Sequence, residues 1–209
     1  DTQSINQITT FQASSLGLLA LLLGFTFSMA ASRFELRRDL IVEEANAIGT
    51  TTLRAELLPA DVRSNVEDLL ESYVHARVEF FDAGIDPALL AKAEKRSIEI
   101  QDRLWVLATA AAQESAQPVN TSLFIQALNE MIDLQSTRKA ALNYRVPEVI
   151  FLVLYIVSFF SFSMVGYGAG LGAKRNFVAT GVMAVLISSV ILLIVDLDRP
   201  RRGLFTISQ

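Results

Sequence analysis

The chain has 209 residues, of which 52% are hydrophobic and 19% are charged, and its formal net charge at pH 7 is −4. The absence of cysteine excludes structural disulfides, thiolate metal sites and thiol catalysis, and a single histidine leaves little for metal chemistry. Without a basic stripe, nucleic acid is not expected as a partner.

Charged side chains are confined to one part of the chain. Residues 2–32, 149–173 and 176–195 contain no Asp, Glu, Lys or Arg, whereas almost every charge lies between residues 33 and 148. A membrane-spanning helix needs about 20 mainly apolar residues. The sequence therefore predicts an integral membrane protein with three transmembrane segments in the lipid bilayer and one polar block in water.

The first transmembrane helix is predicted over residues 11–33. Its apolar part is short and rich in small residues, which suits a helix shielded by neighbouring helices. No proline or glycine interrupts the chain between residues 32 and 48, so the helix is expected to continue to about Arg54.

The polar block, residues 34–145, is predicted to be a cytoplasmic helical domain. After Pro59, an amphipathic helix is expected to end near Phe81. Its apolar side chains recur at helical spacing: Val62, Val66, Leu69, Leu70, Tyr73 and Val74.

Two further helices are expected in this block. Asp86-Pro87 is typical of an N-cap followed by a proline at the first helical position, so the next helix should run to about Gln113. The last should be capped by Asn120 or Thr121 and end near Tyr144. Its core side would contain Leu123, Phe124, Ala127, Leu128, Met131 and Leu134.

The second and third transmembrane helices are predicted over residues 146–173 and 176–196, as an antiparallel hairpin with a tight turn at Lys174-Arg175. Residues 197–209 would form a cytoplasmic tail. Three spans would leave Asp1 outside the cell, so an additional transmembrane helix is expected upstream. No strand-type alternation occurs, and the fold class is predicted to be all α.

The orientation follows from the basic residues near the spans. Lys174 and Arg175 flank one side, and a larger group flanks the other: Arg33, Arg37, Arg38, Arg138, Lys139, Arg145, Arg199, Arg201 and Arg202. The positive-inside rule therefore predicts a multi-pass protein of the cell membrane whose helical domain and C-terminus are cytoplasmic.

One face of the first helix carries a polar stripe. At about 100° per residue, this face contains Ser14, Gly17, Leu21, Phe25, Ser28 and Ser32, followed by Glu35, Asp39 and Glu43. Hydroxyls beside an aqueous path can replace water around an ion, and apolar side chains between them can gate by dewetting. Alternatively, Ser28 and Ser32 allow close helix packing and the carboxylates form an ordinary solvated face.

Part of the first helix resembles a motif of a known family. Leu23-Gly24-Phe25, followed by Ser28 and Ser32-Arg33-Phe34, resembles the pore-helix motif of bestrophins. More closely, the chain is similar to bacterial bestrophin-like domain proteins through four motifs: residues 22–27 (LLGFTF), 44–49 (EANAIG), 127–133 (ALNEMID) and 196–203 (DLDRPRRG). The match covers nearly the whole chain and implies a bacterial inner membrane protein.

The resemblance implies a pentameric ion channel with the first helices around a central pore. The family's neck of three apolar side chains falls on Gly17, Leu21 and Phe25, and Gly17 departs from that pattern. Bestrophins bind calcium after their last span, but here Asp196 and Asp198 are followed by arginines, so no calcium gating is predicted.

Two polar clusters outside the stripe could bind an ion or be structural. Asn129, Glu130 and Asp133 lie on neighbouring helical turns and are expected to form a buried polar cluster or a cation site. Asp196 and Asp198 are expected to pair with the arginines that follow them. His75 has no partner at metal-ligand spacing and is expected to be partly buried and without function.

The leading hypothesis is therefore a homo-oligomeric channel that conducts small monovalent ions passively. Gly17, Leu21 and Phe25 would form the neck, Ser28 and Ser32 the inner mouth, and Glu35, Asp39 and Glu43 a vestibule whose carboxylates favour cations. The alternative is a nonconducting membrane scaffold whose cytoplasmic helices bind a partner protein. No catalytic constellation, cofactor site or metal site is predicted.

Overall fold

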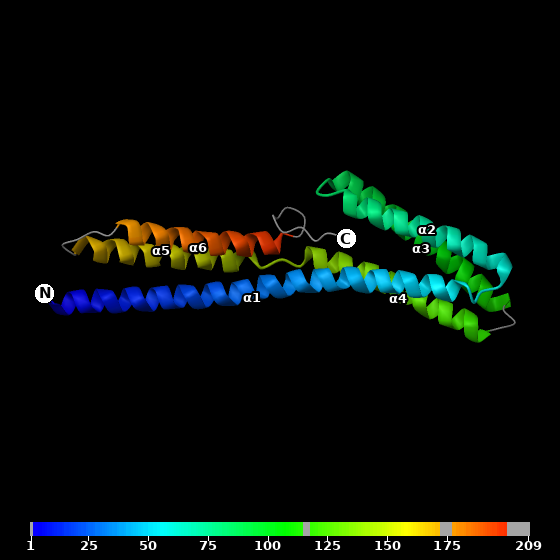
Figure 1. Cartoon of the computed structure of the whole chain (residues 1–209), viewed down its shortest axis with the longest axis horizontal. Coiled ribbons are helices and arrows are strands. Elements are labelled where there is room, and N and C mark those ends of the chain that lie inside the picture. The colour runs from blue at the N-terminus through cyan, green and yellow to red at the C-terminus, as the bar shows by residue number, and fades with distance from the viewer. Residues whose placement is uncertain (1, 115–117, 172–176, 200–209) are drawn as a thin grey trace. The chain divides into compact units, whose positions relative to one another are not determined.

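The computed structural model describes residues 2–114, 118–171 and 177–199, and these ranges form helices joined by short connections (Figure 1). The helices are α1 (Thr2–Ala55), α2 (Ala60–Asp82), α3 (Pro87–Glu114), α4 (Pro118–Asn143), α5 (Glu148–Leu171) and α6 (Phe177–Asp198). No strand occurs in the described ranges, and the predicted all-α class is confirmed.

The chain divides into two compact units. The described residues of 36–114 and 118–143 form one, called here the helical unit, and those of 2–35, 144–171 and 177–199 form the other, called the membrane unit. The predicted turn at Lys174-Arg175 and the tail from residue 200 onward lie outside the described residues.

Helix α1 runs without interruption for 54 residues, as expected from the lack of proline. It ends at Ala55, one residue beyond the predicted Arg54, where Leu57 and Leu58 donate to the carbonyl oxygens of Arg54 and Ala55 at 3.1 and 3.0 Å. It begins at Thr2, so the predicted transmembrane segment over residues 11–33 lies wholly within this helix.

The connection from α2 to α3 follows the predicted chemistry. Gly84 has φ +55°, a left-handed conformation that suits glycine after the end of a helix. Asp86 Oδ1 accepts hydrogen bonds from the backbone N–H groups of Ala88 at 2.9 Å and Leu89 at 3.3 Å. The predicted N-cap before Pro87 is therefore confirmed.

The predicted cap of α4 is wrong. Helix α4 begins at Pro118, so Asn120 and Thr121 lie inside it, and Thr121 is buried. A proline fits the first turn of a helix because its φ is preset and the N–H it lacks would have no helical acceptor there. Pro118 thus starts this helix, whereas the prediction placed the start after it.

The helical unit has one hydrophobic core built from all four of its helices. Its buried members are Ala47, Ala55, Leu58, Val66, Leu69, Leu70, Tyr73, Ala76, Ile100, Leu104, Ala108, Phe124, Leu128 and Met131. Most predicted core positions are confirmed, but Val74 and Leu123 remain 40% and 37% exposed. His75 is also exposed, 4.0 Å from Glu71, so its predicted partial burial is wrong.

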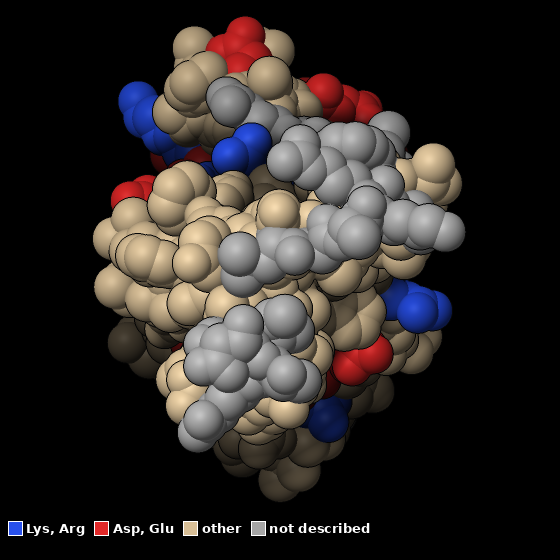
Figure 2. Space-filling view, turned by 90° about the vertical axis from the view of Figure 1, so that its left-hand side faces the viewer, with Lys and Arg blue, Asp and Glu red and all other residues tan. Residues whose placement is uncertain are grey.

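The membrane unit packs the first half of α1 with α5 and α6 around a small apolar core. The buried members are Leu19, Leu23, Ala30, Val146, Leu154 and Ile194. Many large apolar side chains of α5 and α6 stay exposed, among them Phe159 at 69% and Val178 at 77%. Figure 2 looks onto the end that bears the start of α1, where uncharged side chains prevail.

Three helical stretches within the described residues are long and apolar enough to cross a membrane: Asn6–Ala55, Pro118–Gly170 and Val178–Asp198. The apolar part of the second is α5, which carries no charge after Glu148. The three predicted spans are therefore helices of suitable length and composition. Their exposed apolar surface is favourable in lipid and unfavourable in water.

Candidate functional site

The polar stripe of α1 lies on a face that the described part of the chain leaves uncovered. In the membrane unit, Gly17, Ser28 and Ser32 are exposed, and Leu21 and Phe25 are 54% and 65% exposed. The opposite face carries the buried residues Leu19, Leu23, Thr26 and Ala30. The side chains of the stripe are therefore available to water, lipid or another copy of the chain.

The three carboxylates that continue the stripe are exposed as well. Glu35 lies at the end of the membrane unit, and Asp39 and Glu43 follow in the helical unit. The residues that directly follow them, Leu40 and Glu44, are buried, at 4% and 2% exposure. Asp39 and Glu43 thus occupy the side of α1 that faces away from the core of the helical unit.

The predicted cluster on α4 is exposed rather than buried. Asn129 Nδ2 donates to Asp133 Oδ2 at 3.0 Å, and both residues line an open pocket of about 510 Å³ with Glu130 and Arg54. The expectation of a buried polar cluster is therefore wrong, because these positions point away from Phe124, Leu128 and Met131 in the core. Within the described residues, no three His, Cys, Asp or Glu side chains gather as a metal site.

The two aspartates at the end of α6 differ in environment. Asp198 is 5% exposed, and its Oδ1 accepts a hydrogen bond from the backbone N–H of Val146 at 2.8 Å. This bond connects the end of α6 to the segment that precedes α5. The carbonyl oxygen of Asp196 accepts the N–H of Arg199 at 3.1 Å. The carboxylate of Asp198 therefore supports the local structure, while Arg201 and Arg202, its predicted partners, lie outside the described residues.

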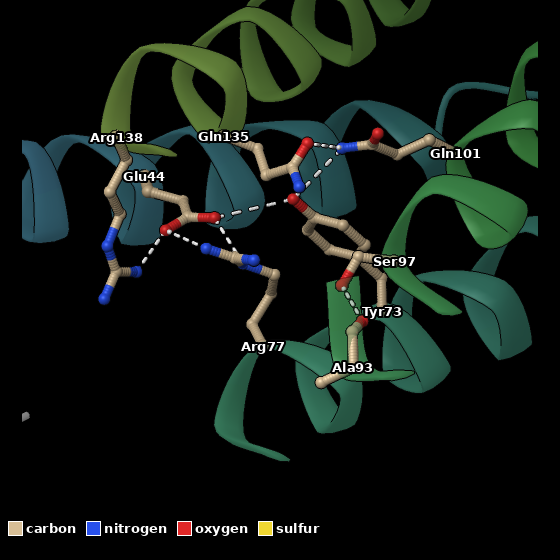
Figure 3. Close-up of polar contacts among 8 residues, drawn as sticks. All are labelled: Glu44, Tyr73, Arg77, Ala93, Ser97, Gln101, Gln135 and Arg138. Atoms are coloured by element: carbon tan, nitrogen blue, oxygen red, sulfur yellow. Dashed lines mark hydrogen bonds and ion pairs between the residues drawn. The ribbon is translucent and has the colours of Figure 1, made fainter. Parts of the chain in front are cut away.

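A buried polar cluster of the helical unit was not predicted. Glu44 of α1 is clamped by two arginines, Arg77 of α2 and Arg138 of α4 (Figure 3). Arg77 donates through Nε to Oε1 at 2.6 Å and through Nη2 to Oε2 at 3.3 Å, and Arg138 donates through Nη1 to Oε2. All three side chains are less than 10% exposed.

Neutral groups extend this cluster across the unit. The hydroxyl of Tyr73 donates to Glu44 Oε1 at 3.5 Å and accepts from Gln101 Nε2 at 3.2 Å, and the same amide lies 3.3 Å from Gln135 Oε1 (Figure 3). Burial raises the pKa of Tyr73 well above its usual value, and the nearby Glu44 carboxylate raises it further. The phenol therefore stays neutral and serves as a hydrogen-bond donor to the carboxylate.

A sequence signal for this cluster was present in the helical spacing. Arg77 follows the apolar Tyr73 by four residues, and Arg138 follows Met131 by seven, so each arginine lies on the buried side of its helix. A buried guanidinium cannot lose its proton and needs a carboxylate partner. Glu44 stands directly beside the exposed Glu43, and their spacing alone does not show which of the two faces the arginines.

These features define the class of the chain: an all-α membrane protein with a buried charge cluster in one unit and an exposed polar stripe on its longest helix. The chain belongs to the bestrophin-like domain family, whose profile matches residues 1–209. This membership indicates an ion-channel-related role and favours no enzymatic one. Comparisons with curated proteins and with solved structures find no match.

Proposed function

We propose that the chain is the subunit of a homo-oligomeric channel that passes small monovalent ions, with one α1 from each copy around a central pore and a pentamer as the assembly. The observation that carries this proposal is the uncovered stripe of α1, where Leu21 and Phe25 are followed by hydroxyls and then by carboxylates, on a face that none of the described helices buries. Family membership supports the same role.

Each part of the stripe has a chemical role in this proposal. Leu21 and Phe25 form an apolar neck that closes by excluding water, and Gly17 leaves the third ring of the neck open. Ser28 and Ser32 offer hydroxyl oxygens to an ion at the inner mouth. Rings of Glu35, Asp39 and Glu43 raise the local concentration of cations, which gives the pore a cation preference.

The membrane orientation is part of the proposal. The helical unit and the C-terminus lie in the cytoplasm of a bacterial inner-membrane protein, on the side with the larger number of arginines and lysines. Ions would then leave the neck between the exposed carboxylates of α1 before they enter the cytoplasm.

The neck is tested by replacing Phe25 with alanine and measuring ion flux in liposomes that contain the purified protein. The smaller side chain widens and wets the neck, so Phe25→Ala should leak faster than the parent chain. Phe27→Ala is the matched control, since Phe27 is also exposed but lies about 200° around the helix. Equal flux from the parent and both variants would refute the neck.

The cation preference has its own measurement. Currents recorded across a bilayer with a salt gradient should reverse near the cation equilibrium potential, and Asp39→Asn with Glu43→Gln should move the reversal potential toward zero. A reversal at the chloride potential would refute the cation preference while leaving conduction intact.

A second candidate function is a nonconducting scaffold that holds a partner protein. An open groove of about 530 Å³ between α2 and α3 favours it, with Asp68, Asp102, Arg103 and Val106 in its lining. Val106 is 65% exposed and Trp105, next to it, is 38% exposed. This candidate predicts no ion flux from any variant and a purified chain that is a monomer or dimer in detergent.

A further inference from the structure

Within the helical unit, α1 packs with several polar side chains directed toward the core. Its buried face includes Arg37, Glu44 and Thr51, each no more than 3% exposed, together with Leu40 and small alanines. Its uncovered face includes three large apolar side chains: Leu36, Val42 and Leu53, which are 49%, 55% and 67% exposed. An amphipathic helix ordinarily packs the other way, with its apolar stripe toward the core.

Hydrophobic burial alone does not select this rotation of α1. A helix turned to bury Val42 and Leu53 would remove their apolar surface from water in exchange for that of Leu40 and Ile48, and would leave Glu44 solvated. Ala47 and Ala55 are small side chains that fit many rotations about equally well, and Ile48 packs against the core but is only partly buried. Some other interaction must select the observed rotation.

The ion pairs of Glu44 have the geometry to do so. Arg77 and Arg138 reach the carboxylate from two different helices, α2 and α4, and together they engage both of its oxygens. A planar guanidinium that donates two hydrogen bonds to a carboxylate fixes direction as well as distance. A turn of α1 would pull Glu44 away from at least one arginine and leave buried charges unpaired.

We propose that Glu44 is a positioning residue: its pairs with Arg77 and Arg138 fix the rotation of α1 about its own axis and thereby keep Asp39 and Glu43 on the uncovered face. At 100° per residue, Glu43 and Asp39 lie about 100° and 140° from Glu44 around the helix. The consequence for ion passage rests on the proposed channel function, whereas the rotation itself does not.

Cysteine labelling measures the rotation directly, because the chain has no cysteine of its own. Single cysteines are placed at Asp39 and Glu43 on the uncovered face and at Leu40 and Ala47 on the buried face of the full chain. Each purified variant is treated in detergent with a water-soluble maleimide. The exposed pair should react at least about tenfold faster than the buried pair.

The same four cysteines are then tested in a background that lacks the clamp charges, Glu44→Gln with Arg77→Met and Arg138→Met. Neutral side chains of similar length keep the interior filled, so helix content by circular dichroism should persist. The difference in labelling rate between the two faces should shrink by about tenfold or reverse. A folded variant that keeps the parent labelling ratio would show that apolar packing sets the rotation, and would overturn the proposal.

Glu44→Asp provides a second test should the triple variant not fold. It keeps every charge but shortens the side chain by one methylene group, so α1 must turn to keep both arginines. Faster labelling at Leu40→Cys is expected, and an unchanged rate would overturn the proposal. Ion flux is measured separately, so a chain that labels as expected but does not conduct would refute the channel alone.

Discussion

Replacing Glu44 by glutamine should destabilise the protein by about 3–5 kcal/mol, which is the usual cost of removing one partner from a buried ion pair. The carboxylate is 2% exposed, so solvent screens it little, and the two arginines that hold it are only 7% and 8% exposed. Glutamine keeps the shape and one acceptor oxygen but removes the negative charge. Two guanidinium groups that cannot lose their protons then remain buried side by side.

The neighbouring Glu43 supplies a matched control. It is the same residue type on the same helix, but it is exposed, so Glu43→Gln should change the free energy of unfolding by no more than about 0.5 kcal/mol. Any general effect of lowering the negative charge of α1 would appear in both variants. The difference between the two variants therefore isolates the buried clamp.

Thermal unfolding in detergent, followed by circular dichroism, gives the readout. For a chain of this size, 1 kcal/mol corresponds to a shift of about 2–4 °C, so Glu44→Gln should lower the midpoint by about 6–20 °C and Glu43→Gln by at most about 2 °C. Equal small shifts in the two variants would mean that the Glu44 pairs contribute little. They would also remove the physical basis for a clamp that orients α1.

Three further predictions test other parts of the structure. Because the pKa of Tyr73 is raised in the folded chain, the unfolded chain loses the phenol proton first as the pH rises. The contribution of this group to stability is therefore retained below about pH 10 and lost above it, at up to about 1.4 kcal/mol per pH unit. Tyr73→Phe should accordingly flatten the alkaline fall of the unfolding midpoint. Asp86→Ala should lower the free energy of unfolding by about 1 kcal/mol because it removes the N-cap of α3. Asp82 is exposed and serves as the control, since Asp82→Ala should leave the unfolding midpoint nearly unchanged. Equal unfolding midpoints for the two variants would contradict the cap. Gly168→Ala should displace the side chain of Gln12, because the added methyl group would meet its Nε2, and so break the 2.6 Å hydrogen bond from this amide to the Met164 carbonyl. If Gln12→Ala together with Gly168→Ala is no more stable than Gly168→Ala alone, the crowding is not the cause.

The parts of the fold that depend on neighbouring residues could be predicted from the sequence. The Asp86-Pro87 pair locates the start of α3 because a cap and a proline act on the first helical turn. The length of α1 follows from the absence of proline between residues 2 and 55. The start of α4 was missed because Pro118 can either end one helix or begin another, and only tertiary packing decides between these.

The clamp could not be predicted in the same way because its partners are far apart in the chain. Arg77 and Arg138 lie 33 and 94 residues after Glu44, and no local spacing connects them. An arginine on the apolar face of a helix needs a carboxylate partner when it is buried. The sequence contains 22 acidic residues and does not identify which of them is that partner. The fold makes that choice by bringing α1, α2 and α4 around one core.

Glu43 and Glu44 show why the function of a charged residue on α1 cannot be assigned from its type. The two are chemically identical neighbours, yet one is exposed and the other is buried between two arginines, because they lie about 100° apart around the helix. Any rotation that brought Glu43 inward would also pull Glu44 from its partners. The exposed carboxylates of the stripe therefore owe their position to a buried one, and a change in the clamp should affect both the stability of the helical unit and the side chains that α1 presents outward.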